Sequence, residues 1–188
     1  AGNAVPVLAN YIPVIDNAIF LGGLAAIGAG VAIAVVRTLW AGRAVGPTLD
    51  GEAATRWAIR ASAIATAVAL GAFVASGLEL SPHLERRAYF ELLFWGGGHV
   101  LQFTWTLLML AAWLWLASAL GLRVPLSPRV AAFLSTIALA AVLVTPFIYL
   151  AHPVASVEHH KLQTWLMRFG GGLAIPPVLV ALLWALAR

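Results

Sequence analysis

The chain has 188 residues, of which 62% are hydrophobic and 10% are charged, whereas a soluble domain usually carries about 25% charged residues. This composition excludes an ordinary soluble domain and predicts an integral membrane protein. The formal net charge of +4 comes from basic residues scattered singly along the chain, so it does not indicate a nucleic-acid partner. Without cysteine, the chain can form neither disulfides nor thiolate metal sites.

Long uncharged stretches predict the helices in chain order. A hydrocarbon core about 30 Å thick needs about 20 helical residues to cross it. Five stretches meet this length, and the sequence therefore predicts an all-α bundle of five transmembrane helices, at about 15–37, 58–79, 92–120, 130–151 and 164–187. We expect a single transmembrane domain over residues 1–188, either alone or as a fragment or split part of a larger subunit.

The distribution of basic residues predicts the orientation of these helices. In a five-helix arrangement, Arg86, Arg87 and Lys161 fall on one side of the membrane. The other side carries the larger group, which comprises Arg37, Arg43, Arg56, Arg60, Arg123, Arg129 and Arg188. Because cytoplasmic loops are enriched in Lys and Arg, we expect an outer amino terminus, a cytoplasmic carboxyl terminus and a cytoplasmic loop at 41–54. The expected location is a bacterial-type inner membrane, with the lipid bilayer as a partner.

The third predicted helix holds the most informative residue, His99. No charged residue occurs between positions 92 and 122, and an ionisable side chain at membrane depth usually marks a functional site. The glycines at 96–98 permit close approach of a neighbouring helix or a flat ligand. Packing alone for the glycines and a hydrogen-bonded, structural role for the histidine are the alternatives. Helical spacing places four residues on one face that should look into the bundle: His99, Gln102, Phe103 and Thr106.

The fourth and fifth predicted helices carry further polar residues. Thr145, Tyr149 and His152 share one face by their spacing, and Pro153 should end the fourth helix, because proline disfavours helical geometry in the preceding residue. His152 would then lie near the outer interface as a metal-ligand candidate or as a solvated loop residue. His159 and His160 are weaker candidates, expected in a solvated turn.

Arg168 lies early in the fifth predicted helix. Its side chain can extend along the helix towards the membrane interface, or it can point inward to a carboxylate, a propionate or an ordered water chain. Together with the histidines it also leaves open a small transporter or channel, because intramembrane ionisable residues can line a path.

The residues of the third helix also suggest a family. The segment at 93–103, Leu-Phe-Trp-Gly-Gly-Gly-His-Val-Leu-Gln-Phe, resembles the sixth transmembrane helix of subunit I in the haem-copper oxidase superfamily, which includes bacterial nitric oxide reductases. The segment at 145–152 looks like the seventh helix. The segment at 164–177, with its late Ile-Pro-Pro, looks like the eighth. The five predicted helices would correspond to about helices four to eight of that subunit.

This resemblance implies a redox site. Neutral imidazoles suit copper or haem iron, and His99 and His152 would be ligands of a copper or iron ion beside a haem. It makes Gly98, Gln102 and Arg168 candidates for cofactor binding, and Tyr149 and Arg168 candidates for catalysis. The chain would then be a membrane redox subunit with other membrane helices or subunits of a respiratory-type complex as partners.

Departures from the family pattern leave the activity open. Ala151 stands where the family has the first histidine of a pair, and Phe103 stands where many oxidases have a tyrosine. The glutamates of nitric oxide reductases and the helices with haem ligands have no counterpart in this chain. An oxidoreductase is therefore expected only if further helices complete the site. The alternative is a non-catalytic membrane subunit that scaffolds a complex or binds haem, quinone or lipid.

Overall fold

The computed structural model describes residues 6–42 and 50–188. It confirms the predicted all-helical architecture. Five helices are long and apolar enough to cross a membrane: α1 (Ala18–Ala41), α2 (Gly51–Glu79), α3 (Arg86–Ala119), the combined helix Pro128–Ala151 and the combined helix Val157–Leu186. The exposed apolar side chains of these helices fit contact with membrane lipid.

Three of these helices begin about one to two turns earlier than the sequence predicts. α2 begins at Gly51 rather than 58, α3 at Arg86 rather than 92, and the last helix at Val157 rather than 164. Each begins after a side chain that accepts hydrogen bonds from backbone N–H groups of the first turn, namely Asp50, Glu85 and Ser156. Such caps stabilise first turns that contain polar residues. These turns lie outside the apolar stretches from which the helices are predicted. Of the loop predicted at 41–54, positions 43–49 lie outside the described residues.

The last two membrane-length helices are interrupted. The first consists of α4 (Pro128–Val142) and α5 (Thr145–Ala151), and the break precedes Pro146, because a proline within a helix removes a backbone donor and crowds the preceding turn. α5 ends at Ala151, before Pro153, as predicted. The second consists of α6 (Val157–Gly170), a short 3₁₀ turn η1 (Gly172–Ala174) and α7 (Ile175–Leu186).

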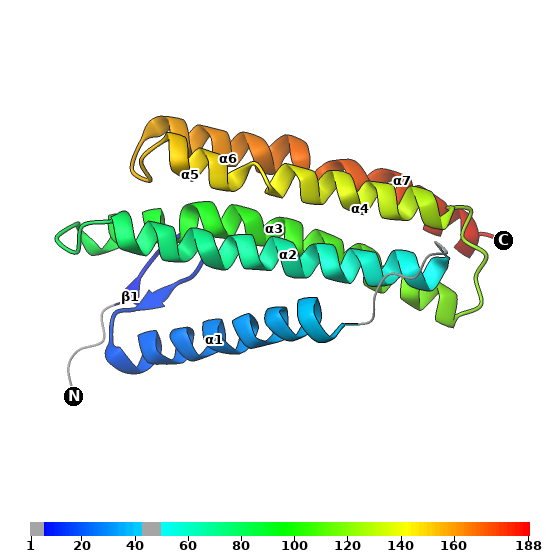
Figure 1. Cartoon of the computed structure of the whole chain (residues 1–188), viewed down its shortest axis with the longest axis horizontal. Coiled ribbons are helices and arrows are strands. Elements are labelled where there is room, and N and C mark those ends of the chain that lie inside the picture. Colours follow the sequence, from blue (N-terminus) through cyan, green and yellow to red (C-terminus); the bar gives the residue numbers. More distant parts are fainter. Residues whose placement is uncertain (1–5, 43–49) are drawn as a thin grey trace.

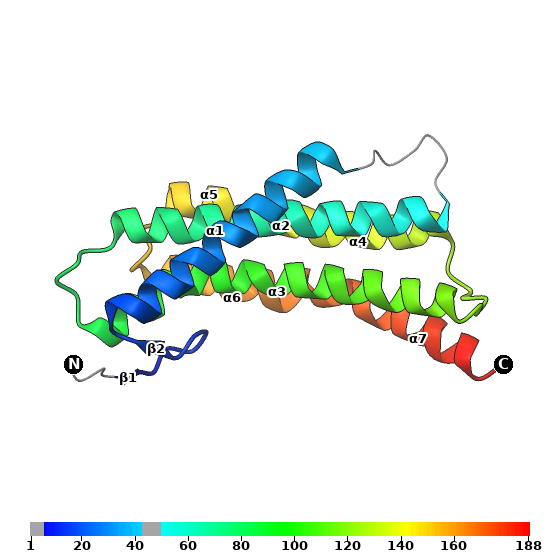
Figure 2. The same cartoon turned by 90° about the horizontal axis from the view of Figure 1, so that it is seen from below.

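A short antiparallel hairpin precedes α1. The sequence pattern does not predict this hairpin. Its strands are β1 (Pro6–Val7) and β2 (Val14–Ile15). Figures 1 and 2 show the hairpin near the end of the bundle that carries the α2–α3 loop and the α5–α6 connection. We call this end the histidine end, because His83 in the α2–α3 loop and the imidazoles at 152, 159 and 160 lie there.

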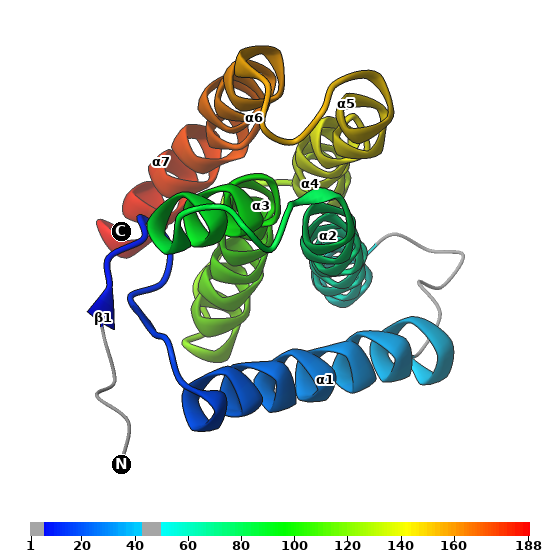
Figure 3. The same cartoon turned by 90° about the vertical axis from the view of Figure 1, so that its left-hand side faces the viewer.

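The bundle is built around α2 and α3, which lie side by side (Figure 1). The α4–α5 segment packs on α2, the α6–α7 segment packs on α3, and α1 crosses obliquely on the other side (Figure 3). Small residues on α2 permit this close packing. The largest cluster of buried residues joins alanines of α2 to larger side chains of α3 and α4, and comprises Ala61, Ala65, Ala69, Val100, Phe103, Leu107, Ala138, Leu139 and Val142. In α1 the only buried residue is Val35.

One ion pair joins the segment before α1 to the first turn of α3. The guanidinium of Arg86 donates to both carboxylate oxygens of Asp16 at 2.6 Å. This hydrogen bonding lowers the pKa of the Asp16 carboxyl below its usual value. Hydrogen bonds from the backbone N–H groups of Arg87 and Ala88 also lower the pKa of the Glu85 carboxyl.

These pKa values predict an acid-sensitive attachment of the hairpin. A carboxyl with a lowered folded pKa stabilises the structure above its unfolded value of about 3.9, and this contribution is lost as the pH falls through the lowered folded value. Leu8 lies next to β1 and is 72% exposed. A spin label attached to a cysteine at this position (Leu8→Cys) should therefore become more mobile when the pH falls below about 4. Asp16→Asn should raise this mobility already at pH 7. Glu85→Gln is the matched control, and equal mobility in both variants at pH 7 would contradict the prediction.

Candidate functional site

His99 lies on α3 and is 5% exposed. Its Nδ1 is 2.7 Å from the backbone oxygen of Trp95 and 2.5 Å from the hydroxyl oxygen of Tyr11. Because a carbonyl oxygen can only accept, Nδ1 carries the proton and donates it to Trp95, and the Tyr11 hydroxyl oxygen can only accept from the same N–H. The other nitrogen, Nε2, is then an unprotonated base with a free lone pair. His99 is thus hydrogen-bonded through Nδ1, and its Nε2 makes no hydrogen bond to the described part of the chain.

Tyr11 comes from the hairpin segment and covers His99. Its ring occupies the space that Gly98 leaves, because a Cβ atom at Gly98 would lie 2.6 Å from the ring. Burial raises the pKa of the Tyr11 phenol, so the hydroxyl stays protonated. No motif in the sequence indicated Tyr11, because its position depends on how the hairpin folds back onto α3.

The three glycines before His99 receive aromatic rings from three different elements. A Cβ atom at Gly96 would overlap the Tyr149 hydroxyl from α5, and one at Gly97 would overlap the Phe73 ring from α2. Together with Tyr11 at Gly98, these contacts account for the triplet by close packing of the protein's own side chains. The glycines predict the close approach of a neighbouring helix or a flat ligand. In the structure, the aromatic rings of Tyr11, Phe73 and Tyr149 make this close approach.

A second polar group lies between α2, α5 and α6. The Tyr149 hydroxyl is 2.9 Å from Oγ of Ser76, and the Tyr149 ring meets the His159 ring edge-on with centroids 4.6 Å apart. The His159 side chain is fully buried, and its Nδ1 is 3.3 Å from the backbone oxygen of His152. The expectation of a solvated turn is therefore wrong for His159. The reason is the early start of α6, which puts this residue in a first helical turn that faces α5.

His160 lies on the neighbouring face of α6. Its Nδ1 is 2.9 Å from the backbone oxygen of Ser156. Its ring centroid is 4.8 Å from that of Trp95, and the Trp95 centroid is 4.9 Å from that of His99. The indole thus lies between two imidazoles. His99, His159 and His160 share one arrangement, in which Nδ1–H donates to a backbone carbonyl and Nε2 is left as a base.

Several buried polar atoms in the described part of the chain have no hydrogen-bond partner. They include Nε2 of His159, both amide atoms of Gln163 and Oγ1 of Thr145. Gln163 follows His159 by one turn on α6, and Thr145 precedes Tyr149 by one turn on the adjacent α5. An unpaired buried polar group costs about 1–3 kcal/mol. Such atoms are expected where a ligand or ordered water binds.

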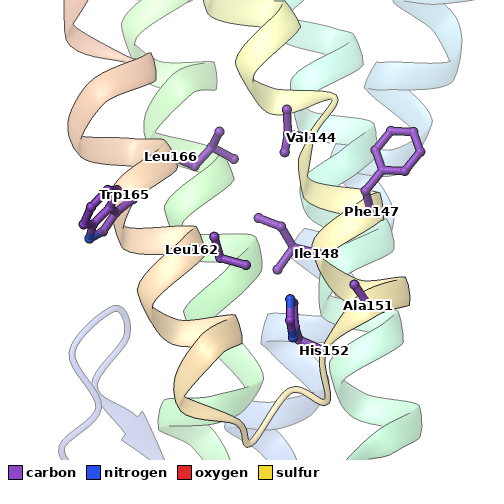
Figure 4. A pocket seen from close by; sticks show the side chains of 8 residues that line it. All are labelled: Val144, Phe147, Ile148, Ala151, His152, Leu162, Trp165 and Leu166. Carbon is purple, nitrogen blue, oxygen red and sulfur yellow. The ribbon is translucent and has the colours of Figure 1, made fainter.

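The structure places the predicted ligand His152 apart from this interior face. Its side chain lines an apolar groove of about 360 Å³ between α5 and α6 (Figure 4). His99 instead contacts Tyr11 and Trp95. The structure therefore brings His99 together with the hairpin rather than with His152, and His152 reaches the interior group through its backbone oxygen.

Two other predicted site residues also lie outside the buried cluster. Arg168 is exposed, and its guanidinium carbon lies 5.7 Å from the centroid of the Phe169 ring. Gln102 is exposed on the face towards Tyr11. The prediction that the four-residue face of α3 looks into the bundle is thus correct for His99 and Phe103 and wrong for Gln102. The reason is that α3 packs against neighbours on two sides. Besides His99, its buried polar residue is Thr104, whose hydroxyl is 3.2 Å from that of Thr66.

No group of three or more His, Asp or Glu side chains within residues 6–42 and 50–188 is arranged to hold a metal ion. A metal bound to one of the three oriented imidazoles would need ligands from elsewhere or a rearrangement of these side chains. Each of these imidazoles therefore has at most one nitrogen, Nε2, to offer to a metal.

Comparisons with known proteins give one distant relative and no family assignment. No family model matches the chain, and no solved structure matches it. An uncharacterized protein of Rickettsia prowazekii (strain Madrid E) is 24% identical over 175 residues, which cover 88% of this chain and 32% of that protein. The chain thus spans about a third of the length of the curated relative that it matches.

Proposed function

We propose that this chain is a membrane redox subunit in which the imidazoles of His99, His159 and His160 bind copper or iron, as an ion or within a haem. The observation that carries this proposal is the shared hydrogen bonding of His99, His159 and His160. Each donates Nδ1–H to a backbone carbonyl, which is the usual arrangement of a histidine that ligates a metal through Nε2. The resemblance of the His99 segment to the sixth helix of haem-copper oxidases supports the same assignment.

The chemistry of the donor set fits these metals. The buried and unpaired Nε2 of His159 is a neutral nitrogen ligand, a type that copper and haem iron accept. A bound copper or haem iron would supply one-electron chemistry. The chain's own residues orient the imidazoles and exclude water. Tyr11 covers His99, Tyr149 covers His159, and the Ser76 hydroxyl holds Tyr149 in place.

An oxidoreductase activity would require further groups. The described histidines do not form a closed metal site, so the missing ligands would come from other membrane helices or subunits of a respiratory-type complex. That the Rickettsia relative is about three times as long as the matched region is consistent with such additional segments. A bacterial-type inner membrane is the location that we propose.

The test is metal and haem analysis of the protein purified from its native membrane complex. We expect bound copper, iron or haem, and His159→Ala and His99→Ala should each weaken its retention by at least about 10- to 100-fold, the range seen when outer partners that only orient a ligand are removed. His83→Ala is the matched control, because this histidine lies in the α2–α3 loop and is exposed. A native preparation without copper, iron or haem would overturn the proposal, as would equal retention in all three variants.

A structural role is the second candidate, and the aromatic contacts favour it. The Tyr11–His99 and Ser76–Tyr149 hydrogen bonds join the hairpin to α3 and α2 to α5. In this alternative the polar residues hold the elements together in a non-catalytic subunit. It predicts a metal-free preparation in which His99→Ala lowers the thermal unfolding midpoint more than His83→Ala does.

A further inference from the structure

The groove between α5 and α6 is lined by different kinds of side chain at its two ends. It has a volume of about 360 Å³, and apolar side chains form most of its lining: Val144, Phe147, Ile148, Ala151, Leu162, Trp165 and Leu166. The remaining lining residue, His152, is at the histidine end of the groove (Figure 4). Its imidazole makes no hydrogen bond to the described part of the chain. The groove is thus apolar over most of its length and polar at one end.

One basic side chain, that of Lys161, lies near the polar end. Lys161 directly precedes the lining residue Leu162 and lies one turn before Trp165, so these side chains are neighbours on the surface of α6. Arg168 continues the same side of the helix three residues after Trp165. Both basic residues are exposed, and neither makes an ion pair within the described residues. The nearest carboxylate in sequence, Glu158, lies in the first turn of α6, where a helix amino terminus favours negative charge.

We propose that this groove binds one acyl chain of an anionic glycerophospholipid, with the lipid phosphate at Lys161 and His152. The largely apolar lining fits an acyl chain, and the indole N–H of Trp165 is the one polar group among the lining side chains other than His152. The ammonium of Lys161 attracts a phosphate as a compact positive charge, and the His152 imidazole can donate a hydrogen bond to it. Basic pockets between transmembrane helices recognise anionic headgroups in this way. The site is separate from the proposed metal site, which uses the imidazoles at 99, 159 and 160.

The test measures which lipid the purified full chain retains. The protein in detergent is mixed with equal amounts of dioleoyl phosphatidylglycerol and dioleoyl phosphatidylcholine, and bound lipid is counted by native mass spectrometry. We expect phosphatidylglycerol to be preferred. Lys161→Gln should reduce this preference by about fivefold, the effect of one lysine near an anionic surface, and His152→Leu should reduce it in the same direction. Arg129→Gln, a cation at the start of α4, should leave the preference unchanged.

A second variant separates the groove from the charges. Ala151→Phe fills the groove while Lys161 and His152 remain, and it should lower phosphatidylglycerol retention at an unchanged thermal unfolding midpoint. Glycerol phosphate alone should bind much more weakly than the whole lipid. Equal retention of the two lipids, an unchanged preference in Lys161→Gln, or full retention in Ala151→Phe would overturn the proposal. Metal content plays no part in this readout, so failure here is distinguishable from failure of the proposed function.

Discussion

Replacing Gly97 by alanine should lower the thermal unfolding midpoint of the protein, whereas replacing Gly71 by alanine should leave it unchanged or raise it. A Cβ atom at Gly97 would overlap the Phe73 ring of α2, and one at Gly71 would meet nothing within 4 Å. Overpacking in a well-packed interior costs about 1–3 kcal/mol. Glycine in the middle of a helix is itself less favourable than alanine by about 0.5–1 kcal/mol. The sign of the change therefore depends on the space around each glycine.

A double variant tests the physical reason for the Gly97 effect. Phe73→Leu removes the ring that the new methyl group would meet, so Gly97→Ala should cost less in the Phe73→Leu background than in the wild-type chain. The measurement is thermal unfolding in detergent for the four combinations. If the Gly97 cost were the same in both backgrounds, the contact with Phe73 would not be its cause.

Phe103→Ala should destabilise the bundle by about 3–5 kcal/mol, the usual cost of removing a buried aromatic side chain. Phe103 is 1% exposed and lies in the largest buried cluster with Val100 and Leu107. Its ring also lies against the break between α6 and η1, because a Cβ atom at Gly170 would be 3.3 Å from it. The substitution therefore leaves a cavity where several helices meet.

Phe133→Ala is the matched control for this prediction. Phe133 lies on α4 and is 62% exposed, so its removal opens no cavity in the described bundle. Both variants are compared with the wild type by reversible unfolding in mixed micelles with increasing SDS. We expect a large loss of unfolding free energy for Phe103→Ala and a small one for Phe133→Ala. Equal losses would show that Phe103 is not a central packing residue.

Phe103 also shows how far a resemblance in sequence can guide interpretation. In the haem-copper oxidases that the segment at 93–103 resembles, many members have a tyrosine at the corresponding position. In this structure the side chain is a packing residue between α3, α4 and α6. The proposed redox site therefore does not involve Phe103. It depends on the imidazoles of His99, His159 and His160.

The number and order of the helices could be predicted because the relevant information is local. A run of about 20 apolar residues is a property of the sequence itself, and so is the proline at 153 that follows the end of α5. The starts of α2, α3 and α6 could not be found in this way. They depend on capping by Asp50, Glu85 and Ser156, which extends each helix through residues that a search for apolar stretches excludes.

For the candidate site, the sequence alone determined that His99 is an ionisable group within an apolar helix beside three small residues. One partner, the backbone oxygen of Trp95, is local to α3, and only the tertiary structure decided the other partners. Tyr11 reaches His99 because the hairpin folds back across a separation of 88 residues, and His159 is buried because α6 begins early enough to face Tyr149. The cost of an imidazole at membrane depth follows from its own chemistry. Its contacts with other elements depend on how those elements pack together. That packing depends on the shapes of aromatic side chains and on the space beside glycines, at positions far apart in the sequence.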